Sequence, residues 1–344
     1  MPKKENILTQ IETAALVGRG GASFSVAQKW AAVKEALRTK KRAYIIANGA
    51  EGEPGVKKDG FIIKHFPEEL INGIDLADKF LGPQKIGHIY IFLSHEYFKK
   101  YTPVLKKVLS AKRYSALEKK IKFIAKPEEL TYVSGEESAL LNLIEGRKIE
   151  PRLKPPYPTS HGLFGSPTLI NNVETFYNIS LVSRGKFKHE RFYTINGAVR
   201  HPGVYSLPAE LTIEDVLKKT NNIPAIKYFV IVGGEAAGEV LRGDQLERPV
   251  EGAGSIMVYD FNKTDRKKLL KYWLRFYFTE SCGNCTICRE GTYRLWELVN
   301  QKKFDKKLFS EIISGLEESS FCALGRSLPI PVKSYFLNIE HEKI

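Results

Sequence analysis

Four cysteines are the residues of this chain best suited to metal chemistry. Cys282, Cys285 and Cys288 have two residues between neighbours, and Cys322 follows much later in the sequence. Three closely spaced thiolates can hold one face of a compact cluster while a distant fourth closes its far corner, so the pattern predicts a [4Fe–4S] cluster. A structural zinc site is the alternative, although its ligands more often come as two separated pairs. Disulfides are disfavoured because no secretory signal indicates an oxidising compartment.

A glycine-rich segment near the N-terminus could bind phosphate. It runs Gly-Arg-Gly-Gly-Ala-Ser from Gly18, and Lys29 follows closely. Glycines allow backbone N–H groups to approach phosphate oxygens, while Arg19 and Lys29 would supply positive charge. The segment is not a Rossmann fingerprint because residues 7–17 before it have a helical pattern rather than that of a strand. A plain turn explains the glycines equally well.

Polar residues follow a predicted strand at residues 43–47. The loop Asn48–Gly55 contains two acids, Glu51 and Glu53, together with three glycines and a proline. Ligands of open α/β sheets bind beyond the carboxyl ends of strands, so this loop is a candidate site. A polar turn is the alternative interpretation.

Two further polar pairs lie near predicted helix starts. Glu136 and Glu137 follow Gly135, where acids favour the helix macrodipole but could also accept hydrogen bonds from a ribose or a carboxamide. Asn171 and Asn172 are expected in a loop, where their amides could meet the edge of a heterocycle or cap the next helix.

Composition limits the class of protein. The chain has 344 residues and a formal net charge of +14, but its lysines are scattered and no nucleic-acid module accompanies them. We therefore interpret the charge as a solvated basic surface that faces an acidic partner or nucleotide phosphates. The sequence has no apolar stretch long enough to span a bilayer, and its basic first residues lack a signal-peptide core. We expect a cytoplasmic protein, at most peripheral to the inner membrane through partner subunits.

The elements that would position these residues divide the chain into three parts. Strands and helices alternate in the first part, which is typical of α/β architecture, and a small mixed β segment and a helical segment follow. The predicted domains are residues 1–188, 189–262 and 263–344. Within the first domain we expect strands at 43–47, 86–93 and 120–125, and helices at 68–80, 96–110, 136–145 and 173–184.

Taken together and in order, these motifs resemble the NADH-binding flavoprotein subunit of respiratory complex I, whose core also occurs in NAD-linked hydrogenases and formate dehydrogenases. The resemblance extends from about residue 16 to residue 335 and includes the glycine loop, the cysteine motif and the Pro-rich segment 151–158. It implies a Rossmann-like FMN and NADH domain, a β-grasp domain of the soluble-ligand-binding type, and a helical bundle that binds the cluster.

The resemblance also implies cofactor contacts and partners. The residues implied for FMN are Gly18, Arg19, Gly20, Lys29, Asn48, Glu51, Gly135, Glu136, Asn171 and Asn172. The residues implied for NADH are Phe24, Glu53, Glu137 and Tyr157, with Phe24 and Tyr157 near the stacked nucleotide. Other redox subunits, including a thioredoxin-like [2Fe–2S] protein, are the implied partners.

The chain departs from the family at several nucleotide-site positions. Ser23 replaces a glycine, and Ser25-Val-Ala27 replaces Pro-Thr-Gly. Ala50 replaces an aspartate that contacts the flavin, and Ala32 replaces an aromatic residue on the adenine side. The predicted function is NADH oxidation through FMN to the cluster and on to partner subunits. The alternative is an iron–sulfur relay or scaffold subunit that has lost flavin or NADH.

Overall fold

The computed structural model describes residues 6–128 and 132–341. Two predictions fall on residues outside the described ranges. No signal-peptide core was expected in the basic residues 1–5, and the end of a strand or loop was expected at residue 131. The chain forms two compact units: Met1–Gly52 with Lys57–His189, and Glu53–Val56 with Glu190–Ile344. The short segment Glu53–Val56 therefore belongs to the second unit, although its neighbours in sequence belong to the first.

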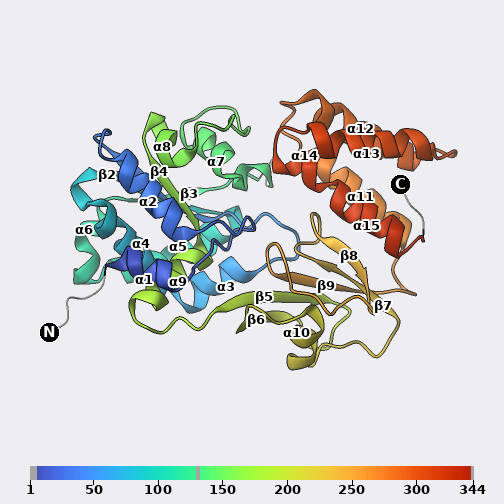
Figure 1. Ribbon diagram of the computed structural model, residues 1–344, viewed down its shortest axis with the longest axis horizontal. Helices are drawn as coiled ribbons and strands as arrows, with labels where there is room; N and C mark the ends of the chain where they lie inside the picture. Colours follow the sequence, from blue (N-terminus) through green and yellow to red (C-terminus); the bar gives the residue numbers. More distant parts are fainter. Residues whose placement is uncertain (1–5, 129–131, 342–344) are drawn as a thin grey trace. The chain divides into compact units, whose positions relative to one another are not determined.

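A four-stranded parallel sheet forms the centre of the first unit (Figure 1). Its spatial order is β3-β2-β1-β4. The strands are β1 (Ala43–Gly49), β2 (Ile86–Leu93), β3 (Ile121–Ala125) and β4 (Thr168–Asn172). β1 is an almost continuous apolar run because helices cover both faces of a parallel sheet.

The sequence patterns predicted β1, β2 and β3 but not β4. Asn171 and Asn172 were expected in a loop, and this expectation is wrong: they end β4 and pair with Ala47 and Asn48 of β1. The segment is short and ends in two amides, so only its pairing with β1 identifies it as a strand.

Helices pack on both faces of this sheet. On one face α4, α5 and α9 contact the strands, and on the other α7 packs its buried leucines against Tyr44, Ile46 and Phe92. The pattern of α4 shows why it forms, since Pro67 opens it, two glutamates occupy its first turn, and Gly82 ends it. The helices are α1 (Ile7–Thr13), α2 (Val26–Ala36), α3 (Lys58–His65), α4 (Pro67–Leu81), α5 (His95–Leu109), α6 (Ser115–Glu118), α7 (Glu137–Ile144), α8 (Pro158–His161) and α9 (Val173–Ser183).

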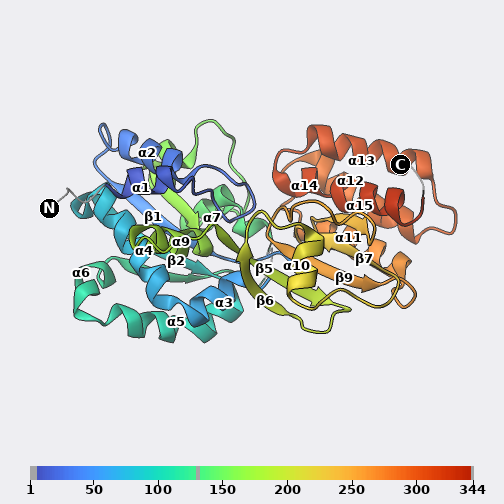
Figure 2. The ribbon, with the colours of Figure 1, turned by 60° about the horizontal axis from the view of Figure 1, so that its bottom comes forward.

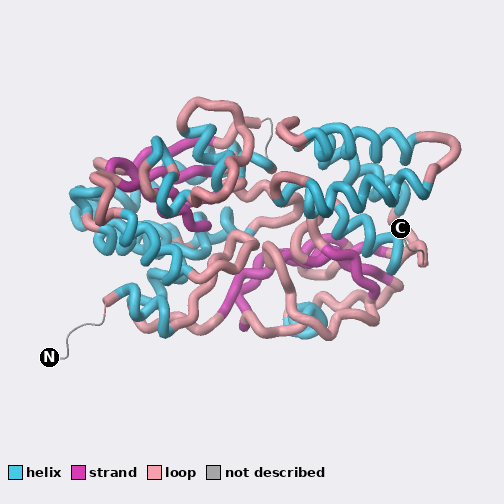
Figure 3. Tube along the Cα trace, turned by 45° about the horizontal axis from the view of Figure 1, so that its top comes forward, coloured by secondary structure: helices cyan, strands magenta, loops and turns pink. Residues whose placement is uncertain are grey.

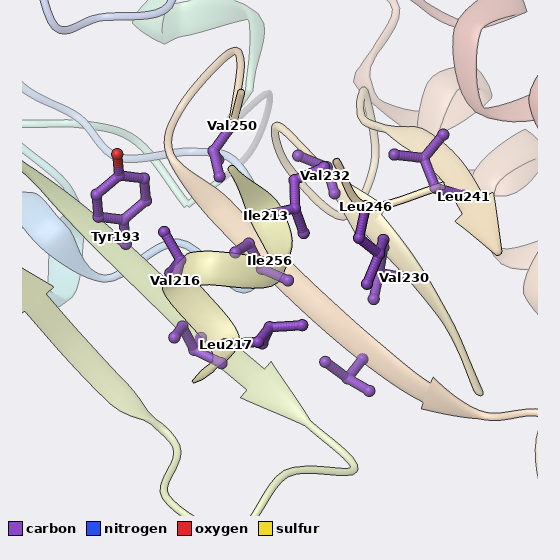
Figure 4. Packing of buried hydrophobic residues seen from close by; sticks show 12 residues of the cluster. Tyr193, Ile213, Val216, Leu217, Val230, Val232, Leu241, Leu246, Val250 and Ile256 are labelled. Atoms are coloured by element: carbon purple, nitrogen blue, oxygen red, sulfur yellow. The ribbon is translucent and has the colours of Figure 1, made fainter. Parts of the chain in front are cut away.

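The second unit begins with a five-stranded mixed sheet of order β6-β5-β9-β7-β8. Its strands are β5 (Glu190–Gly197), β6 (Gly203–Pro208), β7 (Tyr228–Val232), β8 (Glu239–Arg242) and β9 (Ser255–Asp260). Only β5 and β9 pair in parallel. Helix α10 (Ile213–Lys219), which starts with a capping box at Thr212 and Asp215, lies against this sheet (Figure 2). Its Val216 and Leu217 share a buried core with Tyr193 and Ile256 (Figure 4).

The described remainder of the second unit is mainly helical (Figure 3). Its helices are α11 (Arg266–Glu280), α12 (Thr286–Asn300), α13 (Lys306–Ser319), α14 (Ala323–Ser327) and α15 (Pro329–Asn338). α15 is fixed to β8 because Ser334 Oγ accepts from Val240 N at 2.9 Å and Asn338 Nδ2 donates to Val240 O at 2.7 Å. Within the described residues, no helix has the length and apolar character needed to cross a membrane.

Candidate functional site

Two asparagine side chains and the backbone of a third segment meet at the carboxyl edge of the parallel sheet. Asn48, at the end of β1, donates through Nδ2 to Gly135 O at 2.9 Å and accepts from Ala50 N at 3.1 Å. Asn172, at the end of β4, donates through Nδ2 to Asn48 O at 3.2 Å. Asn172 is also the N-cap of α9 and accepts from Glu174 N at 2.9 Å, as the capping interpretation predicted.

The glycine segment is a closed, exposed loop beside this edge. Its ends are joined by the hydrogen bond from Gly18 N to Phe24 O at 2.8 Å, and Arg19 N donates to Thr175 Oγ1 of α9 at 3.0 Å. A Cβ atom on Gly20 would lie 3.5 Å from Asn172 Cβ. The absence of a side chain at Gly20 therefore leaves the backbone of the loop open beside the strand end, as a phosphate cradle requires.

Lys29 and Asn171 approach the same edge from α2 and β4. Lys29 Nζ donates to Ile170 O at 3.1 Å, and burial lowers the pKa of this lysine despite the nearby Glu137 carboxylate. With its amide oriented so that the oxygen faces Trp30, the buried Asn171 side chain accepts from Trp30 Nε1 at 3.0 Å and donates to Ile170 O at 3.0 Å. Asn171 therefore fixes α2, and with it Lys29, against the end of β4.

Two acids and two lysines form an ion network at the start of α7. Lys154 Nζ lies 2.9 Å from Glu136 Oε1 and 2.8 Å from Glu137 Oε1, and Lys29 Nζ lies 3.8 Å from Glu137 Oε2. Glu136 is also the N-cap, accepting from Ser138 N at 2.8 Å. Burial alone would raise the pKa of Glu136, but these hydrogen bonds and Lys154 outweigh it and lower the pKa.

Glu51 is partly buried and faces the start of α3. Its carboxylate accepts from Asp59 N at 2.8 Å, Gly60 N at 3.3 Å and Tyr97 Oη at 2.6 Å. Burial, followed by the neighbouring Asp59 carboxylate, raises its pKa to about 7. Its contacts therefore stabilise the fold of this edge. Glu51 is linked to the strand ends through Asp59, which accepts from Asn172 Nδ2 at 2.7 Å.

A buried lysine joins these acids. Lys58 Nζ lies 2.7 Å from Asp59 Oδ1, 3.1 Å from Glu174 Oε2 and 3.0 Å from Asn172 Oδ1. Burial would lower the pKa of Lys58, but the carboxylates of Asp59, Glu174 and Glu51 raise it. A charged lysine thus orients the Asn172 amide from inside the protein.

The position of the missing aspartate is apolar and enclosed. Ala50 is 2% exposed and packs with Leu140 and Leu141 of α7. A Cβ on Gly135 would lie 3.5 Å from Ala50 Cβ, and Lys126 Nζ donates to Ala50 O at 2.8 Å. The side chain at position 50 therefore offers no polar contact to a ligand.

The residues implied for NADH are divided between the two units. Phe24 and Tyr157 of the first unit have exposed rings, with exposed fractions of 52% and 57%, and Ala32 is exposed on α2. Glu137 belongs to the network at α7. Glu53 lies in the second unit, where its Oε1 accepts from Ala236 N at 2.8 Å and Ala237 N at 3.1 Å.

The four cysteines lie in the helical part of the second unit, and none of them forms a disulfide. Cys285 and Cys322 are the N-caps of α12 and α14, and Cys288 lies in the first turn of α12. Burial, with smaller contributions from the other three thiols, raises the pKa of Cys288 to about 12. Burial also raises the pKa of the Cys322 thiol, although the backbone N–H groups of Leu324 and Gly325 oppose this shift.

The thiols and their surroundings fit a cluster. A Cβ on Gly325 would lie 2.3 Å from Ser320 Oγ and 2.7 Å from Ser320 Cβ, so glycine is needed where α14 passes Ser320, and the same position lies 3.4 Å from Cys288 Cβ. Arg289 holds the loop around Gly283 through Nη1, which donates to Gly283 O at 2.9 Å. In the described part of the chain no three potential ligands are placed to bind a single ion. Thiolates that bind four different iron atoms do not need to converge in this way.

Sequence reasoning missed several residues of the sheet-edge site. Lys58, Asp59 and Tyr97 were not singled out, and neither were Glu174 or Lys154. Two signals could have found them, since Lys58-Asp59 follows closely on the Asn48–Gly55 loop and Glu174 lies two residues after Asn172. A buried lysine requires carboxylate partners, but sequence spacing does not reveal which ones.

Comparison with known proteins gives two family matches, one that includes the sheet-edge site and one that includes the four cysteines. Residues 11–181 match the Nuo51 FMN-binding domain, and residues 268–343 match the NADH-ubiquinone oxidoreductase-F iron-sulfur binding region. The chain is 30% identical over 354 residues to the F subunit of NADH-quinone oxidoreductase from Aquifex aeolicus (strain VF5), across 93% of this chain and 81% of that protein. It is 30% identical over 382 residues to the corresponding protein of Mycobacterium tuberculosis (strain H37Rv), across 98% and 84% of the two chains.

A solved structure has a similar fold. The NAD+-reducing [NiFe]-hydrogenase in its H2-reduced state contains a chain that superimposes with a TM-score of 0.87 at 29% identity. The match covers 97% of this chain and 61% of the hydrogenase chain. This chain thus spans less than two thirds of the length of that hydrogenase chain.

The fold, the strand-edge site and the cysteine motif define an oxidoreductase subunit of the FMN and iron–sulfur class. Within that class, the chain belongs to the family of the F subunits of NADH-quinone oxidoreductase. The predicted α/β fold is confirmed, as are the family and its cofactors FMN, NADH and [4Fe–4S]. The comparisons also confirm the predicted function at the level of the family. This function is electron transfer from NADH through FMN to the cluster, within a complex of several subunits.

Proposed function

We propose that this chain binds FMN at the carboxyl edge of its parallel sheet, oxidises NADH there, and holds a [4Fe–4S] cluster on its four cysteines. Bound there, FMN would supply two-electron chemistry toward NADH and one-electron chemistry toward the cluster. The observation that carries the proposal is the placement of free thiols at the starts of α12 and α14, where Gly325 of α14 lies beside Cys288 of α12.

The residues proposed to hold FMN have different roles. The glycine loop is suited to the phosphate, because its backbone is exposed and Gly20 leaves space beside Asn172. Lys29 is suited to a negatively charged group, since its ammonium already lies at the end of β4. Asn48 and Asn172 offer amide groups, whereas Glu51, Glu136 and Asn171 orient neighbouring groups. The full proposed set is Gly18, Arg19, Gly20, Lys29, Asn48, Glu51, Gly135, Glu136, Asn171 and Asn172.

For NADH we propose stacking on Phe24 and Tyr157 and polar contacts to Glu53 and Glu137. Exposed aromatic rings favour stacking on planar heterocycles. Glu53 has a rigid carboxylate, because two successive N–H groups fix one of its oxygens.

The relay function is a second candidate, and the site at position 50 favours it. Ala50 is buried and apolar, and the Glu51 carboxylate is bound by two backbone N–H groups and Tyr97. A lost charged hydrogen bond to the flavin would weaken binding by about tenfold to a hundredfold, which lowers affinity without abolishing it. We therefore favour the flavoenzyme.

An FMN titration separates the two candidates. Titration of anaerobic protein should give saturable quenching of flavin fluorescence. Lys29→Ala should weaken binding by about tenfold or more, because it removes a charge-assisted contact of about 1.5–3 kcal/mol. Lys99→Ala, an exposed lysine of α5, is the control and should bind as the wild type does. Unchanged flavin fluorescence at high protein concentration would favour the relay.

The finer assignments of partner, location and domains are also proposals. We propose a thioredoxin-like [2Fe–2S] subunit as the next carrier, and an acidic partner surface is favoured by the net charge of +14. We propose a cytoplasmic location, peripheral to the inner membrane through partner subunits. The division at residues 188/189 and 262/263 stays our proposed domain organisation.

A further inference from the structure

The Cys288 side chain is the most deeply buried of the four cysteines. Its exposed fraction is 4%, whereas Cys282, Cys285 and Cys322 are partly exposed. Cys288 lies in the first turn of α12, where Thr292 Oγ1 donates to its carbonyl oxygen at 2.7 Å. Because water has little access to the Cys288 sulfur, a hydrogen bond from the protein to this sulfur acts in a medium of low dielectric constant and is correspondingly strong.

Ser281 places its hydroxyl beside that sulfur. Ser281 Oγ and Cys288 Sγ are 3.5 Å apart, within hydrogen-bond distance for a sulfur atom. Gly283 N donates to the same Ser281 Oγ at 3.3 Å. The hydroxyl oxygen therefore accepts from the backbone, and its proton is left for another acceptor. A cysteine that binds iron is a thiolate without a proton, so between these two side chains the hydrogen bond then runs from Ser281 to Cys288.

Both side chains are held by helices that pack against each other. Ser281 directly follows the last residue of α11 and has an extended backbone. The helix is fixed by Trp273, Leu274 and Tyr277, which are fully buried, and it packs along α12. The donor and the acceptor are thus oriented in advance, and the hydrogen bond needs no rearrangement when the charge on the acceptor changes.

We propose that Ser281 is a positioning residue that raises the reduction potential of the cluster through a hydrogen bond to the Cys288 sulfur. Reduction makes a cluster and its thiolates more negative, and a hydrogen-bond donor stabilises the more negative state. The inference rests on the proposed function, because it takes Cys288 as a cluster ligand.

Three substitutions at position 281 separate the hydroxyl from the shape of the side chain. In Ser281→Ala the ratio of reduced to oxidised cluster at a fixed applied potential should fall by about threefold to tenfold, the range of one net hydrogen bond. A tenfold fall corresponds to about 59 mV for a one-electron couple. Ser281→Thr retains the hydroxyl and should keep the wild-type potential. Ser281→Val has the shape of threonine without the hydroxyl and should behave as Ser281→Ala does.

The test is a redox titration of anaerobic protein with its iron bound, in which electron paramagnetic resonance measures the reduced cluster and the iron content of each variant is determined. Wild-type potentials in Ser281→Ala and Ser281→Val would overturn the inference. Loss of iron from both variants would show that the hydroxyl serves assembly of the cluster, and this result would overturn the tuning role as well.

A spectroscopic readout separates the hydrogen bond from a change in the loop. The Ser281 hydroxyl exchanges its proton in D2O, so pulsed electron paramagnetic resonance of the reduced cluster should detect a coupled deuteron from this group. The coupling should be lost in Ser281→Ala and retained in Ser281→Thr. An unchanged set of deuteron couplings in Ser281→Ala would assign them to other donors and would overturn the inference.

Thr292→Val is the matched control, because the fully buried Thr292 hydroxyl contacts the backbone of Cys288 and not its sulfur. It should leave the potential and the deuteron couplings unchanged, and effects equal to those of Ser281→Ala would contradict the assignment. Wild-type protein that binds zinc without iron would refute the proposed function itself. Wild-type protein that binds iron, with a potential independent of the Ser281 hydroxyl, would refute this inference alone.

Discussion

Lys58→Met should strongly destabilise the first unit. The Lys58 ammonium lies 2.7 Å from Asp59 and 3.1 Å from Glu174, and these three side chains are at most 4% exposed. Methionine fills a similar volume but removes the ammonium group that both buried carboxylates contact. Removal of one partner from a buried ion pair costs about 3–5 kcal/mol, a large part of the stability of a domain. The variant also loses the contact at 3.0 Å that orients Asn172 Oδ1, so FMN affinity should fall as well.

The assay is urea unfolding, with amide hydrogen exchange of β1 and α9 as the probe of the first unit. Lys79→Met is the control, because Lys79 pairs with Asp75 at 2.5 Å but its side chain is 65% exposed. Loss of such an i,i+4 pair costs only about 0.3–0.5 kcal/mol. Equal, small losses of unfolding free energy in both variants would refute the buried network as a source of stability.

Three further predictions concern pH, the cluster and partners. Burial raises the pKa of Glu51 from 4.5 to about 7, so the unfolded chain loses this proton first and the contribution to stability falls as pH rises across that window. Glu51→Gln should therefore flatten the dependence of melting temperature on pH between those values, and an unchanged slope would contradict the assignment. Cys285→Ser should abolish or distort the paramagnetic signal of protein that otherwise contains about four irons per chain, whereas stoichiometric zinc without iron would exclude the cluster. Purified chain should reduce artificial dyes with NADH, yet low-salt affinity purification should recover other redox subunits that are lost at high salt. A lone monomer with full physiological turnover would contradict this.

The regular elements of the fold were largely predictable from sequence. β2 (Ile86–Leu93) begins and ends at the predicted residues, and α4 and α5 differ from their predicted ranges by one residue at each end. These segments have strong periodicity, and capping residues such as Ser94 define where they begin. β4 was not predicted because its strand character depends on pairing with β1, which is a long-range contact.

The candidate site was predictable where residue type alone determines the chemistry. The cysteine spacing identified the cluster motif. The residue types after the predicted strands indicated the amides, and the glycine-rich segment indicated Lys29. The partners of these groups were not predictable, because Lys58 and Lys154 obtain their roles from contacts across the fold. The position of Glu53 in the second unit could not be predicted either, since the chain crosses between units within a short loop.

The most direct test of the central claim is reduction of the cluster by NADH. Anaerobic protein reconstituted with FMN should give the paramagnetic signal of the reduced cluster when it is rapidly frozen after mixing with NADH. Lys29→Ala should lose this response at low FMN concentration and regain it when FMN is in excess. A cluster that is reduced by dithionite, but never by NADH at saturating FMN, would contradict the account.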